Sequence, residues 1–207
     1  MYDIDDLKNL VDMAAGGRNP ADLLITNAKL VDVLTGEIRE TDVSVGGGKI
    51  LGFSHTEAVK VVDARGAYLL PGLIDAHIHI ESSMVSPARF AGLVLPHGTT
   101  SVVADPHEIA NVHGLEGIRY MLENGRHLPL NIALPSCVPA TPFEDSGAVL
   151  SAEELEELID DPKVTGIGEM MNFPGVVSGD YDVLAKIQLG TSHGKIVDGH
   201  APGLLGR

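Results

Sequence analysis

The stretch Pro-Gly-Leu-Ile-Asp-Ala-His-Ile-His-Ile-Glu-Ser-Ser, residues 71–83, holds the most informative pattern in this 207-residue chain. Apolar, β-favouring residues lead into the pair His77 and His79, which predicts that the pair lies on a strand. Side chains on a strand alternate between its two faces, so residues two apart point the same way. His77 and His79 would therefore present two imidazoles to one side, close enough to bind one metal ion.

The spacing of this pair is weak evidence by itself. Nine histidines among 207 residues give roughly 0.4 His-x-His pairs by chance. The context is more informative, because Pro71-Gly72 marks a boundary and the pair ends an apolar strand, where α/β folds place their chemistry. The alternative at this point is that two polar side chains at a strand end hydrogen-bond to nearby backbone.

From residue 71 onward, short apolar segments alternate with segments of helical character. The expected strands cover residues 73–79, 99–104, 130–134, 164–169 and 195–200, and the expected helices cover 87–95, 115–123, 152–159 and 181–189. Ser86-Pro87 and the capping box Ser151-Ala-Glu-Glu154 mark two of the helix starts. Such alternation predicts a parallel sheet covered by helices. Two architectures fit five strands: a doubly wound open sheet, or a (β/α)8 barrel cut off after its fifth strand.

The first 70 residues have a different character. Residues 1–20 hold a short helix, expected over 4–15, and residues 21–70 read as short strands with turns rich in glycine and asparagine. Within the latter, residues 21–33 predict a pair of short strands around an Asn turn. The expected organisation is an N-terminal helix in 1–20, a small β domain in 21–70, and an α/β domain in 71–207.

Composition argues against several classes of function. The formal net charge of −15 disfavours non-specific binding to nucleic acid or to an anionic membrane. The one cysteine, Cys137, allows no internal disulfide, fits a reducing cytosol, and reads as a buried structural thiol. No leader peptide and no apolar run long enough to span a membrane are visible, so we expect a cytoplasmic protein.

Polar residues gather at the predicted C-terminal ends of the strands, which share one edge of a parallel sheet. Three histidines with a carboxylate suit zinc, manganese or iron at a hydrolytic site. A carboxylate that faces the histidine pair could bridge two ions, which generate hydroxide between them. The alternative is that each polar residue only caps its own strand. The residues are His77, His79 and Glu81 after the first strand, Asp105, His107 and Glu108 after the second, Glu169 on the fourth and His200 on the fifth.

Over almost its whole length the chain resembles the amidohydrolase superfamily and, within it, the microbial adenine deaminases. The element Pro-Gly-x-Ile-Asp-x-His-x-His marks the superfamily only. More specific to adenine deaminases are Ile-Glu-Ser-Ser-Met at 80–84, Asp-Pro-His-Glu at 105–108 and Gly-Glu-Met-Met-Asn at 168–172. The resemblance implies a TIM-like (β/α)8 barrel beside a small β-sandwich. This chain would hold about five of the eight barrel strands.

The same resemblance implies hydrolytic deamination of adenine to hypoxanthine and ammonia, in purine salvage, by a homo-oligomer. It implies a binuclear centre of manganese or iron, with zinc as a further option. Carried over by position, His77 and His79 would hold one ion, Glu169 would bridge the two ions, and His200 would bind the second. Glu169 and His200 would thereby act in catalysis. Support of the centre or contact with substrate is expected from Glu81, Asp105, His107 and Glu108.

The family pattern continues with a histidine from strand six and an aspartate from strand eight, which do not occur before Arg207. The chain therefore reads as a fragment, and we expect it to be a weak or inactive deaminase by itself. Two alternatives stay open. One is another cyclic amidohydrolase, such as a dihydroorotase-like enzyme. The other is a non-catalytic, truncated remnant that binds metal or a partner chain.

Overall fold

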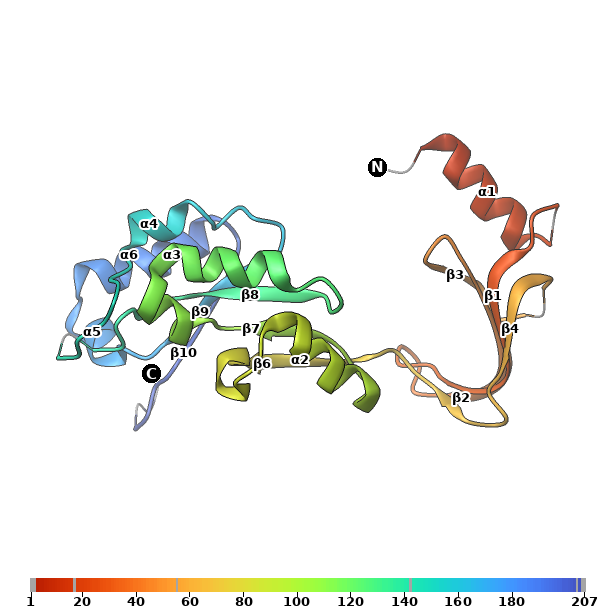
Figure 1. Cartoon of the computed structure of the whole chain (residues 1–207), viewed down its shortest axis with the longest axis horizontal. Helices are drawn as coiled ribbons and strands as arrows, with labels where there is room; N and C mark the ends of the chain where they lie inside the picture. Colours follow the sequence, from red (N-terminus) through yellow and green to blue (C-terminus); the bar gives the residue numbers. More distant parts are fainter. Residues whose placement is uncertain (1–2, 17, 55, 142, 204, 206–207) are drawn as a thin grey trace. The chain divides into compact units, whose positions relative to one another are not determined.

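The computed structural model describes residues 3–16, 18–54, 56–141, 143–203 and 205. The chain divides into two compact units, Met1–Pro71 and Gly72–Arg207, and each unit has its own five-stranded sheet (Figure 1). Within the described residues, no helix combines the length and the apolar character that crossing a membrane requires.

The first unit is a mixed sheet with a helix against it. Strand β1 pairs antiparallel with β2 and parallel with β4 and β5, and β2 pairs antiparallel with β3. The helix α1 contacts β2 and β3. The elements are α1 (Ile4–Ala14), β1 (Ala21–Val31), β2 (Ile38–Gly46), β3 (Lys49–Gly52), β4 (Ala58–Asp63) and β5 (Tyr68–Leu69).

Asn27 does not make the turn that the sequence suggested. It lies inside the continuous strand β1, where the register against β2 shifts between Ile25 and Ala28. Its φ of 54° is left-handed, which asparagine tolerates better than most residues. Its side chain donates to Asp63 over 2.9 Å, and its backbone N–H donates to Asp42 over 3.2 Å. The prediction of two strands was wrong because these bonds stabilise a local irregularity inside one strand.

The second unit contains a parallel sheet in the order β10-β9-β8-β7-β6. Strands that follow one another in the chain are therefore neighbours in space. A doubly wound sheet reverses its strand order at a switch point, whereas a (β/α)8 barrel adds each strand beside the last. The sequential strand order therefore identifies this sheet as part of a (β/α)8 barrel and not as a doubly wound sheet. The strands are β6 (Leu73–Ile78), β7 (Thr99–Ala104), β8 (Leu130–Pro135), β9 (Val164–Met170) and β10 (Ile196–Gly199).

Helices connect these strands, and α3, α4 and α6 lie along one side of the sheet (Figure 1). The capping box of Ser151 and Glu154 is confirmed, and Pro87 occupies the first turn of α2. Ser86 stands at the N-cap of α2 but makes no side-chain capping bond. The elements are η1 (Ile80–Ser83), α2 (Pro87–Val94), η2 (Leu95–His97), α3 (His107–Asn124), α4 (Ala152–Glu156), α5 (Phe173–Ser178) and α6 (Tyr181–Ser192).

Helix boundaries differ from the prediction at α3, α4 and α6, and glycines explain the differences at α3 and α6. Helix α4 ends at Glu156 instead of at residue 159. Helix α3 begins at His107, eight residues before the predicted start. A kink at Gly114, where φ is 54° and ψ is −138°, interrupts its apolar pattern and hides the first part of the helix from sequence reasoning. Helix α6 continues through Gly190 to Ser192. A Cβ at Gly190 would lie 2.8 Å from Cγ1 of Ile167. This glycine therefore permits close packing of helix on strand instead of ending the helix.

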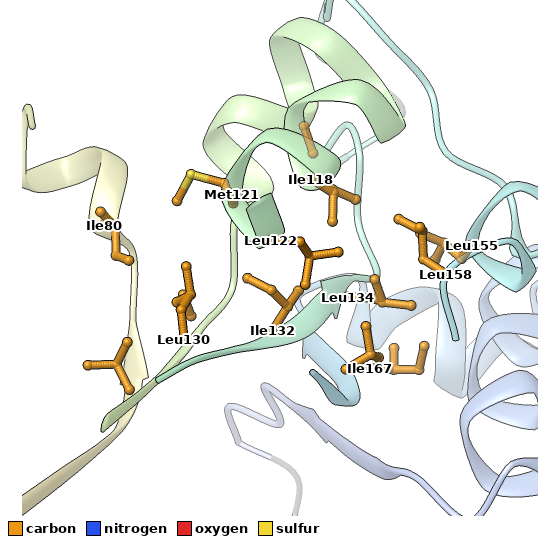
Figure 2. Packing of buried hydrophobic residues seen from close by; sticks show 14 of the residues in the cluster. Ile80, Ile118, Met121, Leu122, Leu130, Ile132, Leu134, Leu155, Leu158 and Ile167 are labelled. Atoms are coloured by element: carbon orange, nitrogen blue, oxygen red, sulfur yellow. The ribbon is translucent and has the colours of Figure 1, made fainter. Parts of the chain in front are cut away.

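The main hydrophobic core lies between the parallel sheet and its helices (Figure 2). Ile132 on the central strand β8 is fully buried, as are Ile118 on α3 and Leu155 on α4. The outer strands are less covered, since Ile74 on β6 is 67% exposed and Ile196 on β10 is 72% exposed. The core thus fixes the middle of the sheet and aligns the strand ends that carry the polar residues.

Candidate metal centre

The candidate ligands stand at the C-terminal ends of the strands β6, β9 and β10. His77 lies on β6 and His79 directly follows it, Glu169 lies near the end of β9, and His200 directly follows β10. Main-chain hydrogen bonds continue past the strand ends: Asp105 N–H donates to the Ile78 carbonyl over 3.0 Å, and His200 N–H donates to the Met170 carbonyl over 3.2 Å. The segments that carry the ligands are therefore held by the strands beside them.

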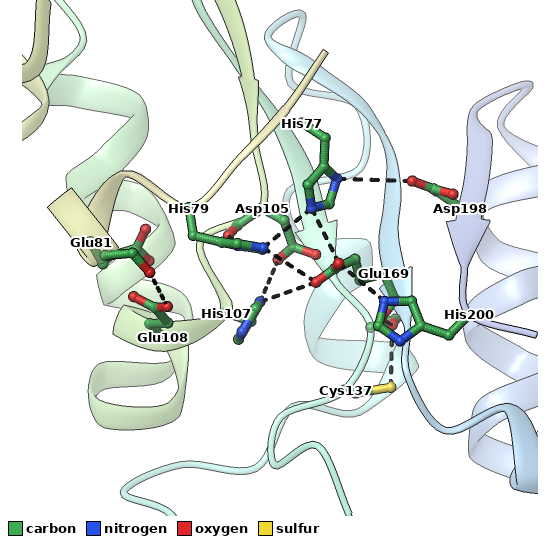
Figure 3. Close-up of polar contacts among 12 residues, drawn as sticks. His77, His79, Glu81, Asp105, His107, Glu108, Cys137, Glu169, Asp198 and His200 are labelled. Carbon is green, nitrogen blue, oxygen red and sulfur yellow. Dashed lines mark hydrogen bonds and ion pairs between the residues drawn. The ribbon is translucent and has the colours of Figure 1, made fainter. Parts of the chain in front are cut away.

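The structure brings His77, His79 and Glu169 together (Figure 3). The two Nε2 atoms are 3.2 Å apart. Nε2 of His77 lies 3.2 Å from Oε1 of Glu169, and Nε2 of His79 lies 3.4 Å from Oε2. Ligand atoms bound about 2.0–2.2 Å from a tetrahedral ion are about 3.3–3.6 Å apart. The three contacts thus fit ligands around one small cation.

His79 has a defined ring orientation. Its Nδ1 lies 2.9 Å from the backbone carbonyl oxygen of Asp105. A carbonyl only accepts, so Nδ1 donates this hydrogen bond and Nε2 is the nitrogen that remains to bind a metal ion. A hydrogen bond of this kind behind a metal-binding imidazole is the usual way in which proteins orient it.

Glu169 connects the histidine pair with His200, whose Nε2 lies 3.2 Å from Oε1. Burial raises the pKa of Glu169, but the hydrogen bond from His200 and the neighbouring charges of His77 and His79 outweigh it. The net effect holds the pKa below its usual range. The carboxylate is therefore ionised at neutral pH and is available as a ligand.

Asp105 and His107 form a second group with His79, in which the ligand atoms lie within 4.8 Å of one another. Nδ1 of His107 is 3.4 Å from Oδ1 of Asp105 and 3.9 Å from Oε2 of Glu169. The Asp105 carboxylate beside it raises the pKa of His107, although burial opposes the shift. These two residues thus lie against His79.

Glu81 in η1 and Glu108 at the start of α3 lie apart from the imidazoles (Figure 3). The Glu81 carboxylate accepts from the Ile109 N–H over 3.1 Å, and burial raises the pKa of Glu81. Glu108 accepts from the Ser82 hydroxyl over 2.6 Å. Their hydrogen bonds thus join η1 to α3.

Sequence reasoning missed Asp198. Its carboxylate is 3.9 Å from Nδ1 of His77. It precedes His200 by two residues in Val-Asp-Gly-His, so the alternation rule that singled out the histidine pair could have found it.

The end of β8 contributes a small polar region. The Ser136 hydroxyl donates to the Glu169 carbonyl over 2.8 Å, and the Cys137 sulfur accepts from the Asn172 N–H over 3.3 Å. Cys137 is only 4% exposed, which confirms that it is a buried thiol. Ser136, Cys137 and Asn172 line a cavity of about 420 Å³.

Gly168 leaves the room that the Asp105 carboxylate occupies. A Cβ at this position would lie 2.4 Å from Oδ2 of Asp105 and 3.1 Å from Cβ of Ala133. Because Asp105 is buried and its carboxylate already fills this space, we expect Gly168→Ala to lower the free energy of unfolding by about 1–3 kcal/mol, as overpacking does. Urea denaturation, monitored by circular dichroism, measures this change in the free energy of unfolding.

Gly92→Ala is the matched control for Gly168→Ala. Gly92 lies in α2, and a Cβ there would meet no atom within 4 Å. Alanine favours a helix over glycine by about 1 kcal/mol, so this substitution should stabilise the chain. Equal stabilisation by both substitutions would contradict the steric argument for Gly168.

Comparison with known proteins agrees with this geometry. The model of the amidohydrolase family matches residues 68–206. A protein named adenine deaminase from Nitratidesulfovibrio vulgaris (strain DP4) is 64% identical over 203 residues, which are 97% of this chain and 35% of that protein. Adenine deaminase 2 from Carboxydothermus hydrogenoformans is 51% identical over 203 residues, with the same coverage of both chains. The chain thus spans about a third of the length of these relatives.

Solved structures support the fold. N-acyl-D-glutamate deacylase from Bordetella bronchiseptica, a complex with zinc and a phosphonate inhibitor, matches with a TM-score of 0.60 and 16% identity. The match covers 88% of this chain and 45% of that one. D-aminoacylase matches with a TM-score of 0.57 and 20% identity, over 85% of this chain and 44% of that one. From the family match and the barrel order of its strands, the chain belongs to the amidohydrolase family.

Proposed function

We propose that this site serves the hydrolytic deamination of adenine to hypoxanthine and ammonia, a reaction of purine salvage. One observation carries the proposal. Glu169 meets His77, His79 and His200 at ligand spacing, in a chain 64% identical over 203 residues to a protein named adenine deaminase. That the whole protein is a cytoplasmic homo-oligomer stays a prediction.

We assign the metal ligands as the resemblance implies: His77 and His79 to one divalent ion, Glu169 as the bridge, and His200 to the second ion. Bound there, the metal would activate water for attack at an electrophilic carbon, here C6 of adenine. Nitrogen and oxygen ligands suit manganese, iron and zinc, and the resemblance favours manganese or iron. Elemental analysis of the protein as purified would identify the metal.

The chain's own residues prepare this chemistry in two ways. The Nδ1–H of His79 is held by the Asp105 carbonyl, which directs the Nε2 lone pair toward Glu169. Glu169 is ionised at neutral pH because its pKa is lowered, so it binds a cation without first losing a proton. The reaction also requires a proton for the departing amine.

A chimera tests the proposed substrate. The matching 203-residue segment of the Nitratidesulfovibrio vulgaris relative would be replaced by this chain, and ammonia and hypoxanthine would be measured with adenine as substrate. We expect turnover in the ordinary range of enzymes, ~1–10³ s⁻¹. Dihydroorotate and hydantoin serve as competing substrates of other cyclic amidohydrolases. A folded, metal-loaded chimera that leaves adenine unchanged would overturn the proposal, as would one that hydrolyses only the cyclic amides.

A further inference from the structure

Asp105 is the most deeply buried carboxylate of the site. It is 1% exposed, and neither of its carboxylate oxygens has a hydrogen-bond partner among the described residues. Folded proteins keep a buried carboxylate when it is paired, hydrogen-bonded or bound to a metal. The missing side chain of Gly168 makes the space for it. The fold therefore buries a carboxylate for which the described residues supply no donor at good hydrogen-bond distance.

The nearest group to Asp105 is itself incompletely bonded. Nδ1 of His107 is buried and has no hydrogen-bond partner in the described part of the chain. At 3.4 Å it is too far from Oδ1 of Asp105 for a good hydrogen bond. These two atoms face each other, and each can offer a lone pair. Their separation of 3.4 Å matches that of two ligand atoms bound to one cation.

Glu169 presents one oxygen to each side of the site. Oε1 lies 3.2 Å from both His77 and His200, whereas Oε2 lies 3.4 Å from His79 and 3.9 Å from His107. His79 belongs to both groups of potential ligands, but the single lone pair of its Nε2 serves one ion at a time. If the binuclear centre proposed above occupies His79, an ion bound by Asp105 and His107 takes Oε2 of Glu169 as its third ligand.

We propose that Asp105 and His107 form a further divalent-cation position beside the proposed binuclear centre. Glu169 would be a ligand of both this position and that centre. The inference rests on the proposed role of Glu169 as a metal ligand. Two carboxylates and one imidazole suit Mn²⁺ or Zn²⁺. The position lies on the side of His79 away from His77 (Figure 3).

Metal content of the 207-residue chain tests this position. The chain would be stripped with a chelator, loaded with Mn²⁺, freed of excess metal and analysed by mass spectrometry of the element. Asp105→Asn and His107→Gln should each bind about one Mn²⁺ per chain fewer than the wild type. His113→Gln is the control, because His113 is exposed on the same helix α3, and it should bind as many ions as the wild type.

Further variants separate this position from the proposed binuclear centre. In a His77→Gln/His200→Gln background, Mn²⁺ that remains bound should be lost when Asp105→Asn is added. If His77→Gln lowers the metal content while Asp105→Asn and His107→Gln leave it unchanged, the further position is overturned and the binuclear centre stands. If only Asp105→Asn and His107→Gln lower the metal content, the assignment of His77 is overturned and the further position stands.

Stability without metal provides a second readout. Asp105→Asn removes a buried, unbonded charge, so the melting temperature in chelator should not fall, while the rise on adding Mn²⁺ should shrink. A structural Asp105–His107 ion pair predicts the opposite: both substitutions lower the melting temperature in chelator and leave Mn²⁺ binding unchanged. That result would overturn the proposal. His107→Gln carries the test if Asp105→Asn does not fold, because His107 is less buried, at 17% exposed.

Discussion

Replacing Glu169 with glutamine is expected to abolish tight divalent-cation binding by this chain. Among the described residues, its two oxygens are the only carboxylate atoms within 3.4 Å of the imidazole nitrogens of His77, His79 and His200. Substituting a group that merely orients a ligand weakens metal binding by 10–100-fold, so loss of a shared ligand should cost at least about 100-fold. Isothermal titration of the stripped chain with Mn²⁺ measures the change.

Glu156→Gln is the matched control for this experiment. It makes the same chemical change on the exposed face of α4, where a charge contributes little to any bound ion. Its affinity for Mn²⁺ should equal that of the wild type. An unchanged affinity in the Glu169 variant would show that the histidines bind metal without this carboxylate, and the assignment of Glu169 as the bridge would be wrong.

The largest expected effect on stability comes from Ile132→Ala. Ile132 lies on β8, the middle strand of the parallel sheet, and is fully buried in the main core. Truncation of a buried isoleucine removes apolar contacts and leaves a cavity, which lowers the free energy of unfolding by about 2–5 kcal/mol. Urea denaturation followed by far-ultraviolet circular dichroism measures the loss.

Ile196→Ala provides the same truncation at the edge of the same sheet. Ile196 is 72% exposed on β10, so its removal should change the free energy of unfolding by no more than about 0.5 kcal/mol. Losses of similar size at the two positions would contradict the core described here. Because the chain has two compact units, the transition of each unit should be followed separately.

The strands and the meeting of the candidate ligands at one edge could be predicted because they depend on local pattern and on one rule of topology. Apolar runs ending in His79, Glu169 and His200 identified the strands. Parallel pairing then brings their ends to a single edge. The choice between a barrel and a doubly wound sheet stayed open, because it depends on the spatial order of the strands, which the amino-acid pattern of each strand does not contain.

The features that escaped prediction depend on packing between distant residues. Helix α5 was missed because it is short and begins Phe-Pro-Gly, a sequence that favours a turn. The part of α3 before Gly114 was missed because a left-handed glycine interrupts its pattern. The burial of Asp105 requires the absence of a side chain at Gly168, and no local pattern connects two residues so far apart.

The hydrogen bonds that continue past the strand ends have a consequence for metal binding. Asp105 is tied to Ile78, and His200 to Met170, by main-chain bonds, so the pairing of β7 with β6 and of β10 with β9 fixes the backbone that carries these candidate ligands. The site is preorganised: folding meets the entropic cost of assembling the ligands before any cation arrives. A change of metal preference between related chains would then require exchange of a ligand atom and no movement of the backbone.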